Sequence, residues 1–293
     1  MEIPYTFAGW PPRRLEEARA AILPVAYDAT TSYRSGTRFG PQEIILASRF
    51  LEMYDEALGL EPGGPGVVTL PELWPDLASP EAALREVQAY VDGLLEKNLF
   101  PVVLGGEHSI TYGAVQAVRK FHPGLSVLVL DAHADLRQDY QGTRYNHACV
   151  SRRILDLGVP VTVLGVRSLP SEDLPLLESG KEPGLNLAWA SQLKAEPDWL
   201  GRFGDRLTET VYLSIDLDFF DPAYVPAVGT PEPGGLGWDE TAAFLAGLAG
   251  RRRLVGFDVV ELDGSVHHTP SAYLAARLVH RLLGLCLPAA DRY

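Results

Sequence analysis

The sequence is short of basic residues. Its 25 Lys and Arg stand against 38 Asp and Glu, which gives a formal net charge of −13 over 293 residues. A nucleic-acid-binding protein needs a basic surface to neutralise phosphates, and the one basic run, Arg251–Arg253, leads directly into a predicted strand. We therefore exclude nucleic acid as an expected partner. An acidic surface instead favours a small cationic ligand.

Cysteine is also scarce, and long apolar runs are missing from the sequence. Two cysteines, Cys149 and Cys286, are too few for a disulfide framework and are typical of a reducing compartment. No apolar run approaches the ~20 residues that a membrane-spanning helix requires, and the N-terminus lacks the basic-then-apolar pattern of an export signal. We therefore expect a cytoplasmic protein without a membrane partner.

What the sequence does contain is a series of short aliphatic segments bounded by turn residues, the pattern of β-strands. Several are apolar on both faces, as in Val127–Leu130, which is typical of parallel strands covered by helices on each side. Eight strands are predicted: Ala20–Ala26, Gly66–Leu70, Phe100–Leu104, Ser126–Leu130, Val159–Val166, Leu185–Trp189, Thr210–Leu217 and Leu254–Val260.

Segments with apolar residues three and four positions apart separate these strands and predict helices. The clearest start is at Ser79, a favoured N-cap residue, with Pro80 at the first helical position. The predicted helices are Pro80–Asn98, Ser109–His122, Val150–Leu157, Pro197–Leu207, Trp238–Gly250 and Ser271–Leu287. Because no repeat, low-complexity tract or change of composition divides the chain, we expect a single α/β domain over residues 1–293.

Polar residues gather at the ends of four predicted strands. The runs are Gly105–Ser109 (Gly-Gly-Glu-His-Ser), Asp131–Asp135 (Asp-Ala-His-Ala-Asp), Ser214–Asp218 (Ser-Ile-Asp-Leu-Asp) and Asp258–Glu261 (Asp-Val-Val-Glu). Ligands of open parallel sheets bind beyond the carboxyl ends of the strands. Each run alone also fits a turn or a helix cap, but their joint occurrence predicts one functional site at that edge.

The spacing within these runs favours a metal centre. Residues i and i+2 of a strand share a face, so Asp131 and His133, and likewise Asp216 and Asp218, can each present two ligands side by side. The candidate ligands are His108, Asp131, His133, Asp135, Asp216 and Asp218. Such an oxygen-rich set suits Mn²⁺, or Fe²⁺ or Co²⁺ in its place, better than structural zinc. Four carboxylates in one cleft repel one another, and two divalent cations would offset that charge.

The same segments resemble the signatures of the ureohydrolase family, which includes arginase, agmatinase, formimidoylglutamase and guanidinobutyrase. Further matching segments are Asp216–Pro222, Gly229–Gly235 and an early Gly36–Pro41. The match runs in order from about Gly36 to Ala275, which is most of the chain. The resemblance implies a three-layer α/β/α fold with an eight-stranded, mainly parallel sheet, and assembly as a homotrimer or homohexamer.

The resemblance also implies two Mn²⁺ ions per subunit and a division of the ligands between them. One ion would be held by His108, Asp131, Asp135 and Asp216. The other would be held by His133, Asp131, Asp216 and Asp218. Asp131 and Asp216 would then bridge the two ions.

Hydrolysis of a guanidinium needs a strong nucleophile, because resonance makes its carbon a poor electrophile. Two divalent cations lower the pKa of water enough to supply hydroxide near neutral pH. Asp135 is the candidate to carry a proton to the leaving amine. Glu261 can accept the guanidinium in a bidentate ion pair, as the resemblance also implies. His147 matches the family's active-site histidine, a proton shuttle or substrate contact; the expected products are urea and a primary amine.

The segment after the second metal motif favours agmatine over arginine as the substrate. Arginases carry an Asn two residues past the last Asp of that motif, whereas this chain has Arg137. Together, Asp135–Arg137, Tyr140–Gly142 and His147–Ala148 look like the bacterial agmatinase branch. We therefore expect a cationic guanidino substrate, agmatine or a derivative such as N1-aminopropylagmatine, used in polyamine synthesis.

Several alternatives remain open at this point. Arginase and guanidinobutyrase share the reacting group, and Arg137 and Arg144 keep formimidoylglutamase open because its substrate has two carboxylates. A non-catalytic family member is a different class, but it should have lost a metal ligand. A zinc deacylase of related fold would use fewer ligands around a single metal.

Other polar residues have blander interpretations. Cys149 is expected to pack as a small core residue, and Asp221, before a proline, to shape a turn. Asp258 is expected to support the end of the last strand. The pair His267–His268 lies in a predicted exposed loop, with the lining of a pocket as the alternative.

Overall fold

The computed structural model describes residues 4–62, 66–178, 182–196 and 198–287. At its centre is an eight-stranded sheet with the strand order β2-β1-β3-β8-β7-β4-β5-β6, and every neighbouring pair is parallel. The strands are β1 (Ala20–Pro24), β2 (Val67–Thr69), β3 (Phe100–Leu104), β4 (Leu125–Leu130), β5 (Val161–Val166), β6 (Leu185–Trp189), β7 (Thr210–Asp216) and β8 (Arg253–Val260). The prediction of eight strands is confirmed.

The helices are interspersed between these strands. They are α1 (Gly40–Ser48), α2 (Pro80–Glu96), α3 (Ile110–Phe121), α4 (Val150–Asp156), α5 (Leu174–Glu178), α6 (Ala190–Ala195), α7 (Trp199–Phe203), α8 (Trp238–Ala249) and α9 (Thr269–Cys286). The six predicted helices correspond to α2, α3, α4, α7, α8 and α9, although the predicted start of α7 at Pro197 lies outside the described residues. The sequence did not predict α1, α5 and α6, because two of them are too short for an apolar repeat and α1 begins inside a Gly-Pro motif.

The start of α2 shows how the local sequence sets an element boundary. The Ser79 side chain accepts a hydrogen bond from the Ala82 N–H at 3.1 Å, and Pro80 occupies the first turn. A proline is well tolerated there, because its missing N–H would have no partner inside the helix. The predicted N-terminus of this helix is confirmed.

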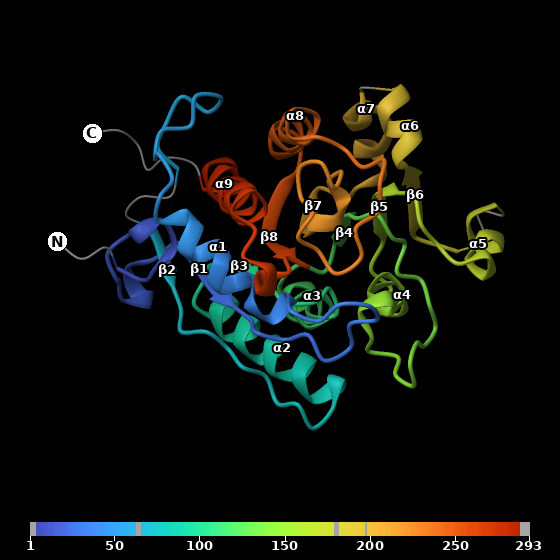
Figure 1. Cartoon of the computed structure of the whole chain (residues 1–293), viewed down its shortest axis with the longest axis horizontal. Helices are drawn as coiled ribbons and strands as arrows, with labels where there is room; N and C mark the ends of the chain where they lie inside the picture. Colours follow the sequence, from blue (N-terminus) through green and yellow to red (C-terminus); the bar gives the residue numbers. More distant parts are fainter. Residues whose placement is uncertain (1–3, 63–65, 179–181, 197, 288–293) are drawn as a thin grey trace.

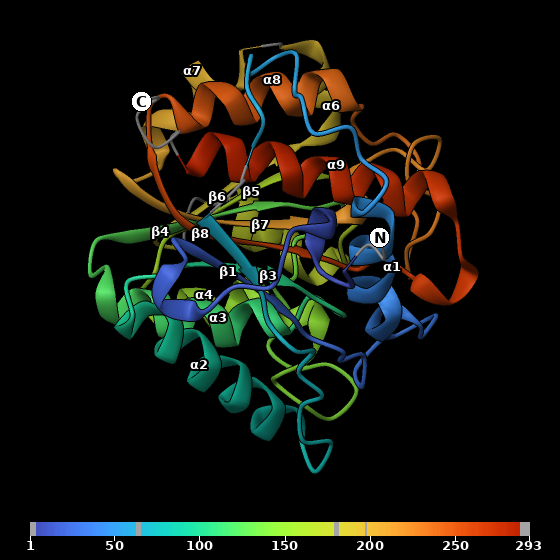
Figure 2. The ribbon, with the colours of Figure 1, turned by 90° about the vertical axis from the view of Figure 1, so that its left-hand side faces the viewer.

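Helices cover both faces of the sheet, which gives three layers (Figures 1 and 2). Alternate residues of one strand enter opposite layers: Val102 and Leu104 belong to the core cluster that contains residues of α8 and α9, whereas Val103 belongs to the cluster that contains residues of α2 and α3. This explains why the strands are apolar on both faces. The predicted three-layer α/β/α architecture is confirmed. None of the helices among the described residues is long and apolar enough to cross a membrane.

The strand order brings the polar runs of the sequence together. In space, β3, β8, β7 and β4 are consecutive, and each of the four runs leaves the carboxyl end of one of these strands. Gly106 allows the tightest approach at this edge, since a Cβ there would lie 1.8 Å from the carbonyl oxygen of Tyr27. Four neighbouring strands therefore deliver their polar residues to one place.

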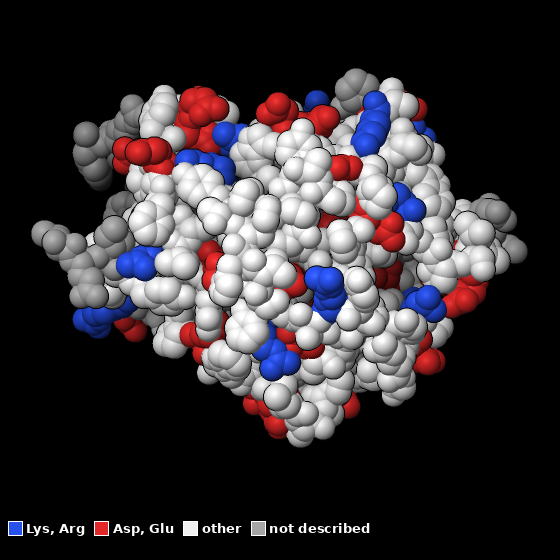
Figure 3. All heavy atoms as spheres, in the orientation of Figure 1, with Lys and Arg blue, Asp and Glu red and all other residues white. Residues whose placement is uncertain are grey.

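On the face shown in Figure 3, Lys and Arg side chains are scattered among acidic and uncharged residues. Asp and Glu outnumber Lys and Arg by 13 over the whole chain, 38 against 25. A small cation approaching the molecule therefore meets an overall favourable field.

Candidate active site

A cavity of about 340 Å³ opens at the carboxyl edge of the sheet. Strand ends supply part of its lining, including Asp135, Asp216 and Glu261. Loops supply the rest, including His147 and Asp173. The cavity thus joins residues from strands that are far apart in the sequence.

One group of candidate ligands surrounds the buried imidazole of His108. Its Nδ1 lies 3.2 Å from Asp131 Oδ2, 3.1 Å from Asp135 Oδ2 and 3.4 Å from Asp216 Oδ2. Neither His108 Nδ1 nor Asp131 Oδ2 makes a hydrogen bond, although both atoms are buried. Buried polar atoms normally have partners, so a lone pair on nitrogen facing three carboxylates fits a bound cation.

A second group lies next to the first and shares Asp131 with it. His133 Nδ1 is 3.5 Å from Asp131 Oδ1 and 3.0 Å from Asp218 Oδ2. In each of the two groups, His108 with Asp131 and Asp135, and Asp131 with His133 and Asp218, the ligand atoms lie within 4.8 Å of one another. The structure therefore brings all six predicted ligand residues together.

The far side of the His108 ring is held by a buried hydrogen-bonded chain. Its Nε2 lies 3.0 Å from the Ser214 hydroxyl, which donates to Asp258 Oδ1 at 2.6 Å, while the Tyr212 hydroxyl donates to Asp258 Oδ2 at 2.9 Å. In the tautomer that carries its proton on Nε2, His108 donates to Ser214 and keeps the Nδ1 lone pair for a metal. Such outer partners orient metal-binding histidines, and this is a concrete form of the support expected from Asp258.

The carboxylates of the cluster repel one another. Burial, followed by the charges of Asp218 and Asp131, raises the pKa of Asp216 well above its usual range. Burial and the charge of Asp131 also raise the pKa of Asp135. Burial disfavours a charged His133, but Asp218 and Asp131 outweigh it and raise the pKa of His133 to about 12. The cluster of carboxylates therefore stabilises protonated side chains, and it would stabilise a bound cation in the same way.

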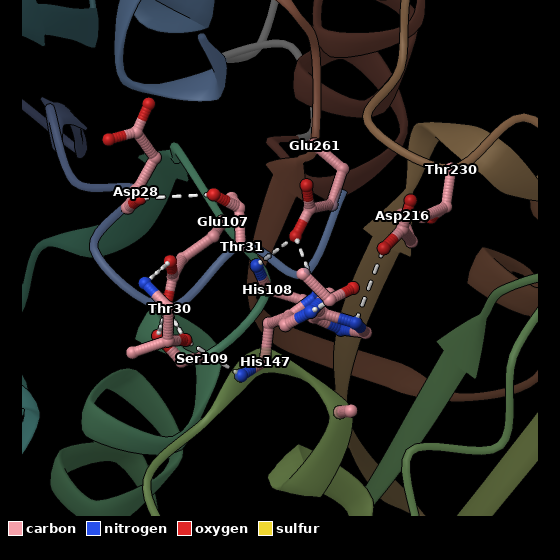
Figure 4. Close-up of polar contacts among 12 residues, drawn as sticks. Asp28, Thr30, Thr31, Glu107, His108, Ser109, His147, Asp216, Thr230 and Glu261 are labelled. Atoms are coloured by element: carbon pink, nitrogen blue, oxygen red, sulfur yellow. Dashed lines mark hydrogen bonds and ion pairs between the residues drawn. The ribbon is translucent and has the colours of Figure 1, made fainter. Parts of the chain in front are cut away.

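Glu261 and His147 meet beside the ligand cluster (Figure 4). Glu261 Oε1 accepts a hydrogen bond from the His108 N–H at 2.7 Å and lies 3.7 Å from His147 Nδ1. Burial disfavours the charged imidazole, but hydrogen bonding and attraction to Glu261 raise the pKa of His147 to about 9. Glu261 and Asp135 both adopt left-handed backbone conformations, with φ of 67° and 52°, which is uncommon for residues other than glycine.

The outer part of the cavity contains one paired cation and one carboxylate oxygen that makes no hydrogen bond. Arg137 lines the cavity, but its guanidinium pairs with Glu172 at 2.7 Å and lies 4.6 Å from the centre of the Tyr140 ring. Asp173 lines the same part, and its buried Oδ2 atom has no hydrogen-bond partner. Asp173 therefore contributes a carboxylate oxygen that no hydrogen bond satisfies.

The chain matches the family model described as the arginase family over residues 18–284. It belongs to this family. The chain is 36% identical over 300 residues to N(1)-aminopropylagmatine ureohydrolase of Synechocystis sp., with 97% of each chain covered. It is 37% identical over 278 residues to agmatinase of Pyrococcus horikoshii, covering 92% of this chain and 93% of that one.

The solved structures agree with these relatives. Agmatine ureohydrolase of Thermoplasma volcanium superimposes with a TM-score of 0.81 at 33% identity, covering 94% of this chain and 92% of that one. The protein is thus an agmatinase-type ureohydrolase with the arginase-like fold, and the resemblance drawn from the sequence motifs is confirmed.

Several residues with blander predictions lie away from the ureohydrolase cavity. Cys149 is buried, and burial followed by the charge of Asp135 raises the pKa of its thiol to about 11, which does not suit a nucleophile. Asp221 accepts hydrogen bonds from the N–H groups of Ala223, Gly234 and Gly235. It therefore shapes a turn, as predicted.

The histidine pair does not line the cavity. The His267 side chain is 78% exposed and lies 3.2 Å from Glu43. His268 Nδ1 accepts from the Ser271 N–H at 3.3 Å and caps α9. The exposed-loop interpretation therefore holds for His267, while His268 has a local structural role.

Sequence reasoning missed the loop residues that shape the cavity. Asp173, Ser32 and Thr230 all line it, yet none belongs to a strand-end run. Thr230 lies within the matching segment Gly229–Gly235 but was given no role from the sequence. Ser32 lies shortly before the Gly36–Pro41 motif, and that proximity is the one signal that could have suggested it. Asp173 carries no comparable signal in its surroundings.

Proposed function

We propose that this ureohydrolase cleaves the guanidino group of agmatine, or of an amine-extended derivative such as N1-aminopropylagmatine, to urea and a primary amine with two Mn²⁺ per subunit. The observation that carries the proposal is the pair of ligand groups sharing the buried Asp131, at the bottom of a cavity that is lined by other members of both groups and by Glu261. The names of the relatives, agmatinase and N(1)-aminopropylagmatine ureohydrolase, support the substrate class.

The donor set fits manganese. It contains imidazole nitrogens and carboxylate oxygens without a thiolate, which suits Mn²⁺ among the divalent metals. We assign one ion to His108, Asp131, Asp135 and Asp216, and the other to His133, Asp131, Asp216 and Asp218. When bound, two such ions lower the pKa of water and make hydroxide available near neutral pH. The absence of hydrogen bonds at His108 Nδ1 and Asp131 Oδ2 supports this assignment.

The remaining chemistry falls to side chains around the cavity. Glu261 is anchored through Oε1 by the His108 N–H, so its carboxylate has a fixed direction in which to receive a guanidinium. Asp135, which lines the cavity, carries a proton to the nitrogen that leaves. His147, held beside Glu261, exchanges protons between the cavity and solvent.

The outer cavity supports a substrate with a cationic tail. Asp173 offers a buried oxygen without a hydrogen bond, which suits the distal ammonium of agmatine. Arg137 is engaged by Glu172, and Arg144 pairs with Asp156 at 3.1 Å. These pairings weaken the case for formimidoylglutamate and 4-guanidinobutyrate, whose carboxylates would need a free basic group.

Urea release by the Mn²⁺-loaded protein tests this function. The comparison is kcat/KM for agmatine, N1-aminopropylagmatine, arginine and 4-guanidinobutyrate, with formamide release measured for formimidoylglutamate. Preference for either of the first two is expected. Preference for arginine would contradict the substrate assignment, and release of no product from any of them would favour a non-catalytic family member. A metal content near one per chain would favour the single-metal alternative.

Further properties of the protein are part of the same proposal. We propose that residues 1–293 form one domain, supported by the single eight-stranded sheet and by the match over residues 18–284. The expected setting is polyamine synthesis in the cytoplasm, and the expected assembly is a homotrimer or homohexamer. Sedimentation equilibrium of the Mn²⁺-loaded protein tests the assembly, and a monomer would contradict it.

A further inference from the structure

Glu107 is a fully buried carboxylate that neither lines the cavity nor belongs to a ligand group. Its Oε2 accepts from the Thr30 N–H at 2.6 Å. Its Oε1 accepts from the Thr30 hydroxyl and, at 2.5 Å, from the Ser109 hydroxyl. Burying an ionisable group is costly unless hydrogen bonds compensate it, so this arrangement calls for a purpose beyond packing.

The Thr30 hydroxyl continues the chain of hydrogen bonds towards the cavity. Because it donates to Glu107, its oxygen is free to accept, and it accepts from the His147 N–H at 3.0 Å. The Thr30 carbonyl oxygen also accepts from Asn146 Nδ2 at 3.1 Å. Glu107 is therefore linked through Thr30 to the backbone of His147 (Figure 4) and to the side chain of Asn146.

The loop that contains Thr30 also reaches the imidazole of His147. The Ser32 hydroxyl lies 3.1 Å from His147 Nε2, and Ser32 itself lines the cavity. The loop is closed by Asp28, whose Oδ2 accepts from the Gly36 N–H at 2.8 Å. His147 is thus held at its backbone by Thr30 and at its ring by Ser32, on one loop.

We propose that Thr30, held in place by Glu107, is a positioning residue that, with the loop Asp28–Gly36, sets the place of His147 at the cavity. The inference rests on the proposed function, in which His147 moves protons. Misplacement of a reacting group by about 1 Å can cost roughly 10²-fold in rate. A threonine that only satisfies the buried Glu107 carboxylate would not act through His147, and this difference can be tested.

Thr30 and Ser109 provide a matched pair of variants. Both hydroxyls donate to Glu107 Oε1, but only that of Thr30 also accepts from His147. Glu107→Gln places amide hydrogens against donors and can prevent folding, so the decisive variants are Thr30→Val and Ser109→Ala. We expect Thr30→Val to lower kcat about tenfold with KM changed less than about twofold, from misplacement of a proton-transfer group.

The controls separate positioning from packing. Ser109→Ala should stay within about twofold of the wild type, and Thr30→Ser, which keeps the hydroxyl, should restore most of kcat. When His147→Ala is already present, adding Thr30→Val should lower kcat little further, because the imidazole that Thr30 positions has been removed. Equal losses in Thr30→Val and Ser109→Ala, or an undiminished tenfold loss in the His147→Ala background, would overturn the inference.

Hydrogen exchange gives a readout that does not depend on turnover. In the Mn²⁺-loaded protein, peptides covering residues 144–149 should exchange faster in Thr30→Val than in the wild type or in Ser109→Ala. If the wild type releases no urea while this pattern appears, the proposed function fails and the positioning contact stands. If urea is released but exchange and kcat are the same in both variants, the proposed function stands and the inference fails.

Discussion

The cavity has two regions that differ in the elements that supply their residues, in burial and in how far the sequence predicts them. The cavity floor, made of the six candidate ligands and Glu261, comes from the ends of four adjacent strands and is tied together by hydrogen bonds. The cavity wall, which includes Arg137, Tyr140, Ser168–Pro170 and Asp173, comes from loops and a short 3-10 helix. Under the proposed function, the residues at the strand ends carry out the reaction, whereas the residues of the loops determine substrate specificity.

The largest expected effect comes from Asp131, which both ligand groups share. Asp131→Asn should remove metal from both groups and lower kcat/KM by at least about 10³-fold, since a two-metal site supplies several kcal/mol of transition-state stabilisation. Metal content by mass spectrometry and urea release together measure it. Asp139→Asn makes the same chemical change at an exposed position and should alter neither; a similar loss there would undermine the assignment.

The second largest effect is expected at Glu261, where a substitution should separate guanidinium binding from metal binding. Glu261→Gln should leave both metals in place, because Glu261 is in neither ligand group. We expect kcat/KM to fall roughly 10²-fold, since a neutral amide cannot form the charge-assisted pair with the guanidinium. Steady-state kinetics on agmatine provide the measurement. A change smaller than threefold would remove Glu261 from the site.

A smaller effect is expected at Asp258, which is linked to His108 through the Ser214 hydroxyl. Asp258→Asn should weaken metal affinity about 10–100-fold, as is typical when the partner behind a metal-bound histidine is lost. Tyr212→Phe is the matched control, because Tyr212 donates to the other Asp258 oxygen and does not contact His108. Metal titration of both variants should show the larger loss in Asp258→Asn; the reverse order would mean that Ser214 does not relay the effect.

The smallest effect belongs to the wall and should depend on the substrate. Asp173→Asn should lower kcat/KM for agmatine about tenfold, corresponding to ~1.4 kcal/mol at a partly solvated ion pair. Butylguanidine has the same reacting group without the ammonium, so its kcat/KM should change much less. Glu81→Gln removes an exposed carboxylate that pairs with Arg85 and does not line the cavity, and it serves as the control. Equal losses on both substrates would place Asp173 in the reaction itself.

The floor was predictable from the sequence and the wall was not, for a physical reason. In a strand, a spacing of two residues determines which side chains share a face, so Asp131 with His133 and Asp216 with Asp218 could be paired without a structure. Parallel strands that are buried on both faces are equally recognisable, which is why all eight were found. Loop geometry has no such period.

Individual contacts between residues far apart in the chain could not be predicted from the sequence. Arg137 was noted as unusual, but its neutralising partner Glu172 lies 35 residues away. Thr30 and Glu107 are 77 residues apart, and neither residue type suggests the other. The short helices α5 and α6 were not predicted because five or six residues do not complete two turns of an apolar repeat.

The left-handed backbone of Glu261 has a consequence for how this enzyme can change. A residue with a side chain stores strain of order 1–3 kcal/mol in such a conformation, and glycine would relieve it. The Glu261 side chain also accepts a hydrogen bond from the buried His108 N–H, so Glu261→Gly exchanges that hydrogen bond for relief of the backbone strain. Under the proposed function the strained backbone is kept because the same side chain receives the guanidinium, in line with the clustering of such conformations at active sites.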